Sequence, residues 1–120
     1  MPEKLLIVDD EPANVDMLSQ ELEEEGYALM TARDGAEALI KVQERLPDLI
    51  LLDVMMPNLD GFETLRMLRE VSSVPVIMLT AKSRDVDQEK ALALGADDYV
   101  TKPFSTRELV ERVRRILGGA

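Results

Sequence analysis

With 120 residues, the chain is long enough to close one hydrophobic core and too short for two, so residues 1–120 are predicted to form a single domain. It contains no cysteine and no histidine, which excludes disulfides, thiolate metal sites, the commonest zinc ligands and general-base catalysis by imidazole. The net charge of −10 disfavours direct nucleic-acid binding, because phosphates would be repelled, and the lack of a long apolar run or a signal-peptide pattern favours a cytoplasmic protein without membrane spans.

Short aliphatic runs alternate with amphipathic segments along the chain. This alternation is typical of an α/β fold in which helices cross over between parallel strands. The predicted strands are residues 5–8, 28–31, 49–52, 76–79 and 99–101. The predicted helices lie near residues 12–25, 35–46, 61–71, 84–94 and 105–117.

The sequence specifies some of these helices more clearly than others. The segment 105–117 carries a clean apolar stripe at helical spacing, whereas the apolar residues of 84–94 do not keep to one face. We therefore expect the fourth helix to pack weakly. Three predicted helix starts have the spacing of a capping box, namely Asp34 with Glu37, Asp60 with Glu63 and Ser105 with Glu108.

Strand composition predicts the order of the strands. The first, third and fourth runs (LLIV, LILL, VIML) are apolar throughout, as strands covered on both faces must be, whereas ALMT and YVT are mixed and suit edges. Right-handed crossovers then favour a doubly wound, five-stranded parallel sheet of order 2-1-3-4-5, which is the flavodoxin-like arrangement. Ligands bind such sheets beyond the carboxyl ends of the strands, where the winding reverses between the first and third strands.

Polar residues stand where four of the apolar runs end. Asp9 and Asp10 follow the first run, Asp53 the third, Thr80 the fourth and Lys102 the fifth. In a parallel sheet all of them lie at one edge, where the three carboxylates would repel one another without a cation. Oxygen ligands without His or Cys select a hard divalent ion, so we predict a Mg²⁺ or Mn²⁺ site. The alternative for Asp10 is a cap of the following helix.

A carboxylate beside a metal ion, with a lysine and a hydroxyl within reach, can accept a phosphoryl group. The carboxylate attacks phosphorus, while the metal, the ammonium of Lys102 and the hydroxyl of Thr80 stabilise charge on the phosphoryl oxygens. Taken singly, Thr80 also suits an ordinary strand end and Lys102 a solvated turn. Their combination favours phosphoryl transfer to Asp53.

The segments LLIVDDE, LILLDVMMPNLDGF, PVIMLTA and GADDYVTKPF together resemble the receiver domain of two-component response regulators, over residues 4–117. The family resemblance implies a switch that assists only its own phosphorylation and dephosphorylation, and not an enzyme. It implies Mg²⁺ as the ion. The roles that it implies are phosphoacceptor for Asp53, metal ligands for Asp9, Asp10, Asp53 and the backbone carbonyl of Met55, and phosphoryl contacts for Thr80 and Lys102.

The resemblance also implies partners and an output surface. The phosphoryl group would come from a sensor histidine kinase or a phosphotransfer protein, and the receiver would control a downstream effector or a fused output domain. Thr80 and Tyr99 would form the switch pair, and the fourth helix, fifth strand and fifth helix would form the output face. The alternative for Tyr99 is ordinary packing on an edge strand.

Charged residues on that face raise the question of a dimer. Receivers of winged-helix transcription factors dimerise through salt bridges on this surface. A homodimer is one interpretation and a solvated helix face is the other, since exposed ion pairs contribute only about 0.2–1 kcal/mol each. The residues expected to face one another are Asp97 and Asp98 on one side and Arg112, Arg114 and Arg115 on the last helix.

Two other function classes share part of this sequence pattern. An aspartyl-phosphate-forming hydrolase of the haloacid dehalogenase type also has a nucleophilic Asp after a strand, but it has a second Asp two residues on, where this chain has Met55. A nucleotide-binding fold is disfavoured because no glycine-rich loop follows the first strand.

Overall fold

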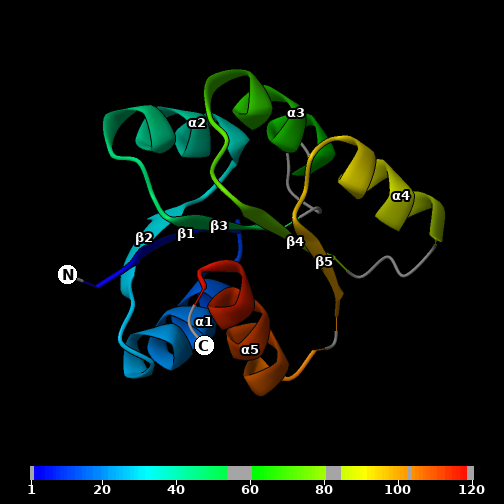
Figure 1. Cartoon of the computed structure of the whole chain (residues 1–120). Helices are drawn as coiled ribbons and strands as arrows, with labels where there is room; N and C mark the ends of the chain where they lie inside the picture. The colour runs from blue at the N-terminus through cyan, green and yellow to red at the C-terminus, as the bar shows by residue number, and fades with distance from the viewer. Residues whose placement is uncertain (1, 54–60, 81–84, 103, 119–120) are drawn as a thin grey trace.

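The structure, a computed structural model, describes residues 2–53, 61–80, 85–102 and 104–118. A central parallel sheet is covered by helices on both faces, with α2, α3 and α4 on one face and α1 and α5 on the other (Figure 1). The strands are β1 (Lys4–Val8), β2 (Ala28–Ala32), β3 (Leu49–Asp53), β4 (Val76–Thr80) and β5 (Asp98–Thr101). The helices are α1 (Pro12–Glu24), α2 (Gly35–Glu44), α3 (Gly61–Val71), α4 (Asp85–Ala93) and α5 (Thr106–Ile116).

The sheet has the order β2-β1-β3-β4-β5, which confirms the predicted topology. Every residue of β3 and β4 is buried, whereas β2 and β5 are mostly half-buried, as expected for edge strands. The strands extend beyond the aliphatic runs by one residue at several ends. As a result, Asp53 and Thr80 are the last residues of β3 and β4 and do not lie in loops.

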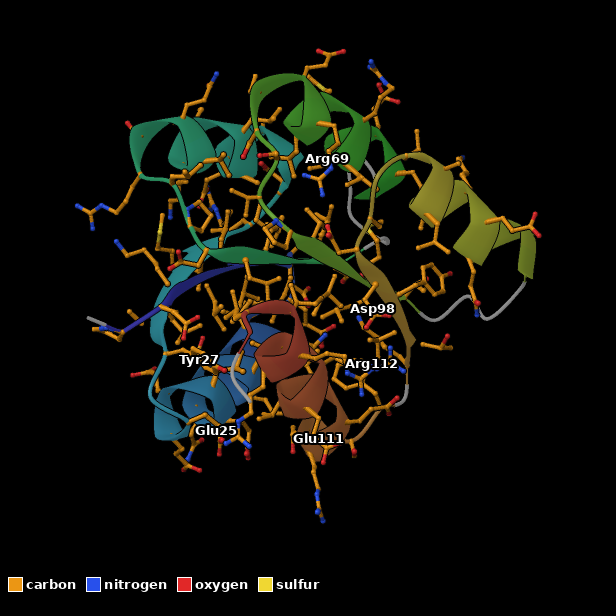
Figure 2. All side chains as sticks on the ribbon, viewed as in Figure 1. Glu25, Tyr27, Arg69, Asp98, Glu111 and Arg112 are labelled. Atoms are coloured by element: carbon orange, nitrogen blue, oxygen red, sulfur yellow. The ribbon has the colours of Figure 1, made fainter. Side chains whose placement is uncertain are left out.

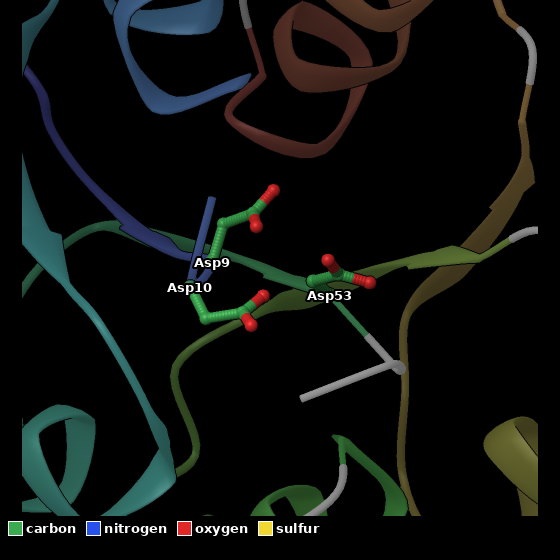
Figure 3. Close-up of side chains that lie close together, drawn as sticks. All are labelled: Asp9, Asp10 and Asp53. Carbon is green, nitrogen blue, oxygen red and sulfur yellow. The ribbon is translucent and has the colours of Figure 1, made fainter. Parts of the chain in front are cut away.

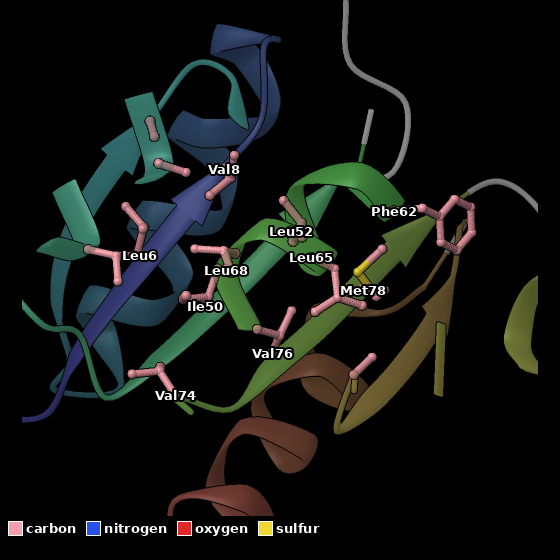
Figure 4. Close-up of a cluster of buried hydrophobic side chains, with 14 of the residues drawn as sticks. Leu6, Val8, Ile50, Leu52, Phe62, Leu65, Leu68, Val74, Val76 and Met78 are labelled. Carbon is pink, nitrogen blue, oxygen red and sulfur yellow. The ribbon is translucent and has the colours of Figure 1, made fainter. Parts of the chain in front are cut away.

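The sheet divides the hydrophobic interior of the domain into two cores, one on each face, so the expectation of a single undivided core was wrong. Side chains alternate between these two cores along each strand. Leu5 and Ile7 of β1 pack beneath α1 and α5, while Leu6 and Val8 pack with the helices of the other face. Figure 4 shows the second of these cores, where Leu6, Val8, Ile50, Leu52, Phe62, Leu65, Leu68, Val74, Val76 and Met78 gather between the sheet and its helices.

Two of the predicted helix caps are present. The Asp34 side chain accepts a hydrogen bond from the backbone N–H of Glu37 at 2.9 Å. Ser105 accepts one from the backbone N–H of Glu108 at 3.0 Å. The third predicted cap begins at residue 60, which lies outside the described residues. None of the helices within the described ranges has the length and apolar character that a membrane span requires.

The contrast expected between the last two helices is confirmed. In α5, Leu109 and Val113 are buried against the sheet. In α4, Ala91 is the one buried side chain among those of residues 88–93, and Leu92 is 55% exposed. The sheet therefore holds α5 firmly and α4 loosely.

Candidate functional site

Three carboxylates meet at the carboxyl end of the sheet. Asp9 and Asp10 follow β1, and Asp53 ends β3, the strand that pairs with β1. One carboxylate oxygen from each lies within 4.8 Å of those of the other two (Figure 3). Asp9 and Asp53 are only 3% and 4% exposed, while Asp10 is exposed. Two buried carboxylates at this separation need positive charge nearby.

Backbone groups fix the position of Asp9. Its N–H donates to the carbonyl of Ala32 at 3.0 Å, and its Oδ1 accepts from the N–H of Glu11 at 2.9 Å. Burial raises the pKa of the Asp9 carboxyl, and the charge of Asp53 adds to this rise; the Glu11 N–H and the Lys102 ammonium act in the opposite direction. Burial is the largest of these influences, and it acts against the charged form of the Asp9 carboxyl.

Asp10 does not cap the first helix. The residue at the N-cap position of α1 is Glu11, its side chain makes no cap hydrogen bond, and Pro12 begins the helix. Pro12 has no N–H to satisfy, which reduces the need for a cap. The alternative that assigned Asp10 to capping is therefore wrong, and its carboxylate faces the other two acids (Figure 3).

The neighbouring strands bring a lysine and a hydroxyl to the same edge. Lys102 Nζ lies 3.4 Å from Asp53 Oδ2. The backbone N–H of Lys102 donates to the carbonyl of Thr80 at 2.6 Å, which ties the ends of β4 and β5 together. Thr80 is fully buried at the end of β4, next to β3. The four predicted strand ends thus converge in the folded chain.

The donor set suits a small divalent cation. Carboxylate oxygens alone, with one of the three acids open to solvent, are the ligands that Mg²⁺ takes when it keeps several waters. The backbone carbonyl of Met55, the other predicted ligand, lies outside the described residues. The chemistry of Asp9, Asp10 and Asp53 therefore fits the predicted ion.

A cavity of about 270 Å³ opens beside the carboxylates, between α1 and the start of α5. Asn14 and Met17 were not singled out from the sequence, because isolated residues at a helix surface carry no distinctive pattern. Its lining joins two site residues to a mainly apolar wall: Asp9, Asn14, Met17, Leu18, Leu79, Lys102 and Phe104.

Tyr99, the predicted partner of Thr80, is partly buried. Its side chain packs against the core on the side of α2, α3 and α4. It also lines a surface hollow with Gln88, Leu92 and Arg112. The ring therefore lies where α4, β5 and α5 meet.

The charged pairs predicted on this face are only partly present. Arg112 Nη1 bonds both oxygens of Asp98, at 2.7 and 2.8 Å (Figure 2). The expectation for Asp97 was wrong, because Asp97 pairs with Arg69 of α3 at 3.0 Å. It was also wrong for Arg114, which pairs with Glu25 at the end of α1. Strand β5 begins at Asp98, so consecutive side chains leave in different directions.

Comparison with known proteins decides the family. The sequence model of the response regulator receiver domain matches residues 5–114. The chain belongs to the response regulator receiver family. Receiver domains of two-component systems are switches that phosphorylation activates, and this one has the acidic cluster typical of them.

Individual relatives support the same family. The alkaline phosphatase synthesis transcriptional regulatory protein PhoP of Bacillus subtilis is 52% identical over 98% of this chain. This receiver spans 49% of the length of that protein. Chemotaxis protein CheY4 of Vibrio cholerae superposes with a TM-score of 0.92 at 35% identity, covering 97% of this chain and 99% of CheY4. A two-component response regulator from Clostridium difficile gives a TM-score of 0.93 at 32% identity, covering 97% and 96% of the two chains.

The match settles the choice between function classes. A receiver of a two-component system acts as a signalling switch. The alternative of a hydrolase of the haloacid dehalogenase type finds no support among these relatives.

Proposed function

We propose that Asp53 of this receiver accepts a phosphoryl group from a phosphohistidine of a sensor histidine kinase or a phosphotransfer protein. A carboxylate oxygen of Asp53 attacks phosphorus, the P–N bond to the imidazole breaks, and the departing imidazole takes up a proton. The product is an aspartyl phosphate. The observation that carries the proposal is the 3.4 Å approach of Lys102 Nζ to Asp53 Oδ2 at the edge where Asp9 and Asp10 also converge.

Each neighbour of Asp53 has a task in this transfer. The Lys102 ammonium neutralises charge that develops on the phosphoryl oxygens, and the Thr80 hydroxyl donates a hydrogen bond to one of them. Asp9, Asp10 and Asp53, with the Met55 carbonyl, would hold Mg²⁺. The ion, when bound, offsets the repulsion between the phosphoryl oxygens and these carboxylates.

We assign this site only reactions of its own phosphoryl group. It assists its own phosphorylation and dephosphorylation, and we assign it no other substrate. Phosphorylation changes the conformation of the receiver. Thr80 and Tyr99 respond to the phosphoryl group and alter the face formed by α4, β5 and α5. The hollow between Tyr99 and Arg112 on that face supports this assignment.

The relatives suggest how the signal is used. PhoP of Bacillus subtilis is a transcriptional regulatory protein about twice as long as this chain. Residues 1–120 would then be one receiver domain that controls a fused output domain or a separate effector, in the cytoplasm. A homodimer through α4, β5 and α5 is one way in which that control could be exerted.

Labelling with a small acyl phosphate tests the site directly. With Mg²⁺ present, the protein should gain one phosphoryl group, and Asp53→Asn should abolish the label because an amide is a poor nucleophile. Removing Mg²⁺ with a chelator should suppress labelling. Asp16→Asn, which makes the same charge change at an exposed position of α1, is the matched control and should label normally.

Two outcomes would contradict the proposed function. Undiminished labelling of Asp53→Asn would place the phosphoacceptor elsewhere. Rapid turnover of simple phosphate esters by the unmodified protein would show a hydrolase and not a switch.

A further inference from the structure

The described side chains of α4 pack lightly against the rest of the domain. Among the other helices and strands, α4 packs chiefly against β5. Ala91 is buried, but its neighbour Leu92 is 55% exposed. Residues 88–93 of α4 thus bury little apolar surface. Weakly packed elements have low local stability, and such elements supply the moving parts of switches.

One end of this helix is nevertheless fixed. Arg69, near the end of α3, donates from Nε and Nη2 to the carbonyl of Gly95 at 3.0 and 2.7 Å (Figure 2). Its Nη1 donates to the carbonyl of Val74 at 2.7 Å, and its Nη2 to Asp97 at 3.0 Å. Arg69 therefore joins the turn that follows α4 to the start of β4. Any motion of α4 has to pivot about this carboxyl-terminal end.

A second contact holds α4 nearer its middle. The ammonium of Lys90 lies over the ring of Phe62, with 4.6 Å between Nζ and the ring centroid. Phe62 is 6% exposed and belongs to the core of Figure 4, whereas Lys90 lies at the surface. Cation–π pairs at exposed sites are weak but directional, so a modest rotation of α4 separates them.

The place of Phe62 in the chain connects this pair to the phosphoacceptor. Phe62 is the second residue of α3, the element that follows Asp53 in the sequence. Lys90 is on the lightly packed helix α4, and Phe62 belongs to the hydrophobic core. The contact therefore links α4 to α3, the helix that follows Asp53 in the sequence.

We propose that Lys90 and Phe62 form a latch that holds α4 in its unphosphorylated arrangement and opens when the receiver switches. This rests on the proposed phosphorylation of Asp53. A contact made in one of two states stabilises that state alone, so losing it shifts the balance toward the other. Removing the latch should favour the activated arrangement by about two- to fivefold, the factor equivalent to a cation–π pair of about 0.5–1 kcal/mol.

The experiment uses beryllofluoride, a mimic of the phosphoryl group, with Mg²⁺ and the whole chain. Lys90→Met keeps an apolar stem and removes the cation, and it should bind beryllofluoride about two- to fivefold more tightly than the parent protein. Lys90→Arg keeps the cation and is the matched control, with affinity close to that of the parent. Amide hydrogen exchange without beryllofluoride should be faster across α4 in Lys90→Met.

Phe62→Leu completes the test, since it keeps an apolar side chain and removes the ring. It should reproduce the tighter binding, and adding Lys90→Met to it should have little further effect, as expected for two residues that act through one contact.

The possible failures can be told apart. If the parent protein binds beryllofluoride and Lys90→Met binds it equally or more weakly, the latch is overturned and the proposed function stands. A full effect of Lys90→Met in the Phe62→Leu background also overturns the latch, because the ring would not be the partner. If the parent does not bind at all, the proposed function fails and the latch with it.

Discussion

Helices α4 and α5 flank the same edge strand, β5, and they are held in opposite ways (Figure 1). Leu109 and Val113 anchor α5 in the core, and Ser105 caps its first turn. Among residues 88–93 of α4, Ala91 is the one buried side chain. Two side chains of α3 contact this region: Phe62 lies under Lys90, and Arg69 donates to the carbonyl of Gly95. One side of β5 is therefore fixed and the other can adjust, which is the asymmetry that a switch at this strand requires.

The largest expected effect comes from removing the anchor of α5. Leu109→Ala should lower the free energy of unfolding by about 2–5 kcal/mol, because it leaves a cavity at a side chain that is 1% exposed. Leu92→Ala in α4 removes the same atoms from a side chain that is 55% exposed, and it should stay within about 0.5 kcal/mol. Urea denaturation measures both. Equal losses would show that α4 is as firmly packed as α5.

Loss of the Arg69 hydrogen bonds should have the second-largest effect on the free energy of unfolding. Arg69→Met leaves the carbonyls of Gly95 and Val74 and the carboxylate of Asp97 without this donor, and it should lower the free energy of unfolding by about 1–3 kcal/mol. Hydrogen exchange should also rise in the turn after α4. Arg66→Met is the control, since Arg66 lies on the same helix and, within the described residues, pairs with Glu63 and Glu70 of that helix. A variant at Arg69 as stable as that control would exclude an anchoring role.

The cap of α5 should contribute less. Ser105→Ala removes the acceptor for the N–H of Glu108 and should cost about 1 kcal/mol in thermal or urea unfolding. Ser105→Asp keeps an acceptor and should restore most of the stability. If both substitutions behave alike, the cap does not contribute to holding α5.

The ion pair between β5 and α5 should contribute less to the free energy of unfolding than the Ser105 cap does. The side chains of Arg112 and Asp98 are 30% and 25% exposed, so solvent screens their attraction. Arg112→Met should lower the free energy of unfolding by less than about 1 kcal/mol, and the difference should shrink in high salt. Arg107→Met, at a 90% exposed position of α5, is the control. A loss that is unchanged by salt would point to packing of the Arg112 stem.

The smallest effect concerns the far end of α5, where Arg114 lies beside Tyr27 and pairs with Glu25. Burial raises the pKa of the Tyr27 phenol above its usual 10.0. The folded state then keeps a proton that the unfolded state releases. The resulting stabilisation is present below about pH 10 and is lost as the pH rises through the raised pKa.

Tyr27→Phe tests the direction of this pH dependence of stability. Its stability should fall less steeply than that of the parent protein above pH 10, with no difference in slope near neutral pH. Absorbance titration of the phenolate provides a second measurement, and an equal slope for both proteins in alkaline solution would count against the shift.

Much of the fold could be read from residue pattern alone. Uninterrupted apolar runs identify strands buried on both faces, and the mixed runs ALMT and YVT mark the edges. The site followed from the same pattern, because every parallel strand ends at one edge of the sheet. The sequence could therefore predict that three residues lie close together, namely Asp9, Asp53 and Lys102.

The polar contacts could not be predicted in the same way. The expected partners of Asp97 lay on α5, but its partner is Arg69 on α3. A one-residue difference in where β5 begins decides which way each aspartate points. Long, flexible arginine side chains reach partners at many distances, so spacing in the sequence does not select among them.

The sequence by itself determined the strand order and the convergence of the acids with Lys102, because hydrophobic periodicity and the geometry of parallel sheets leave few alternatives. Only the tertiary structure decided that Asp10 is free of the α1 cap, that Arg69 fixes the end of α4, and that Lys90 lies over Phe62. Those contacts join residues from separate elements. Their formation depends on the relative placement of helices, which local sequence pattern does not specify.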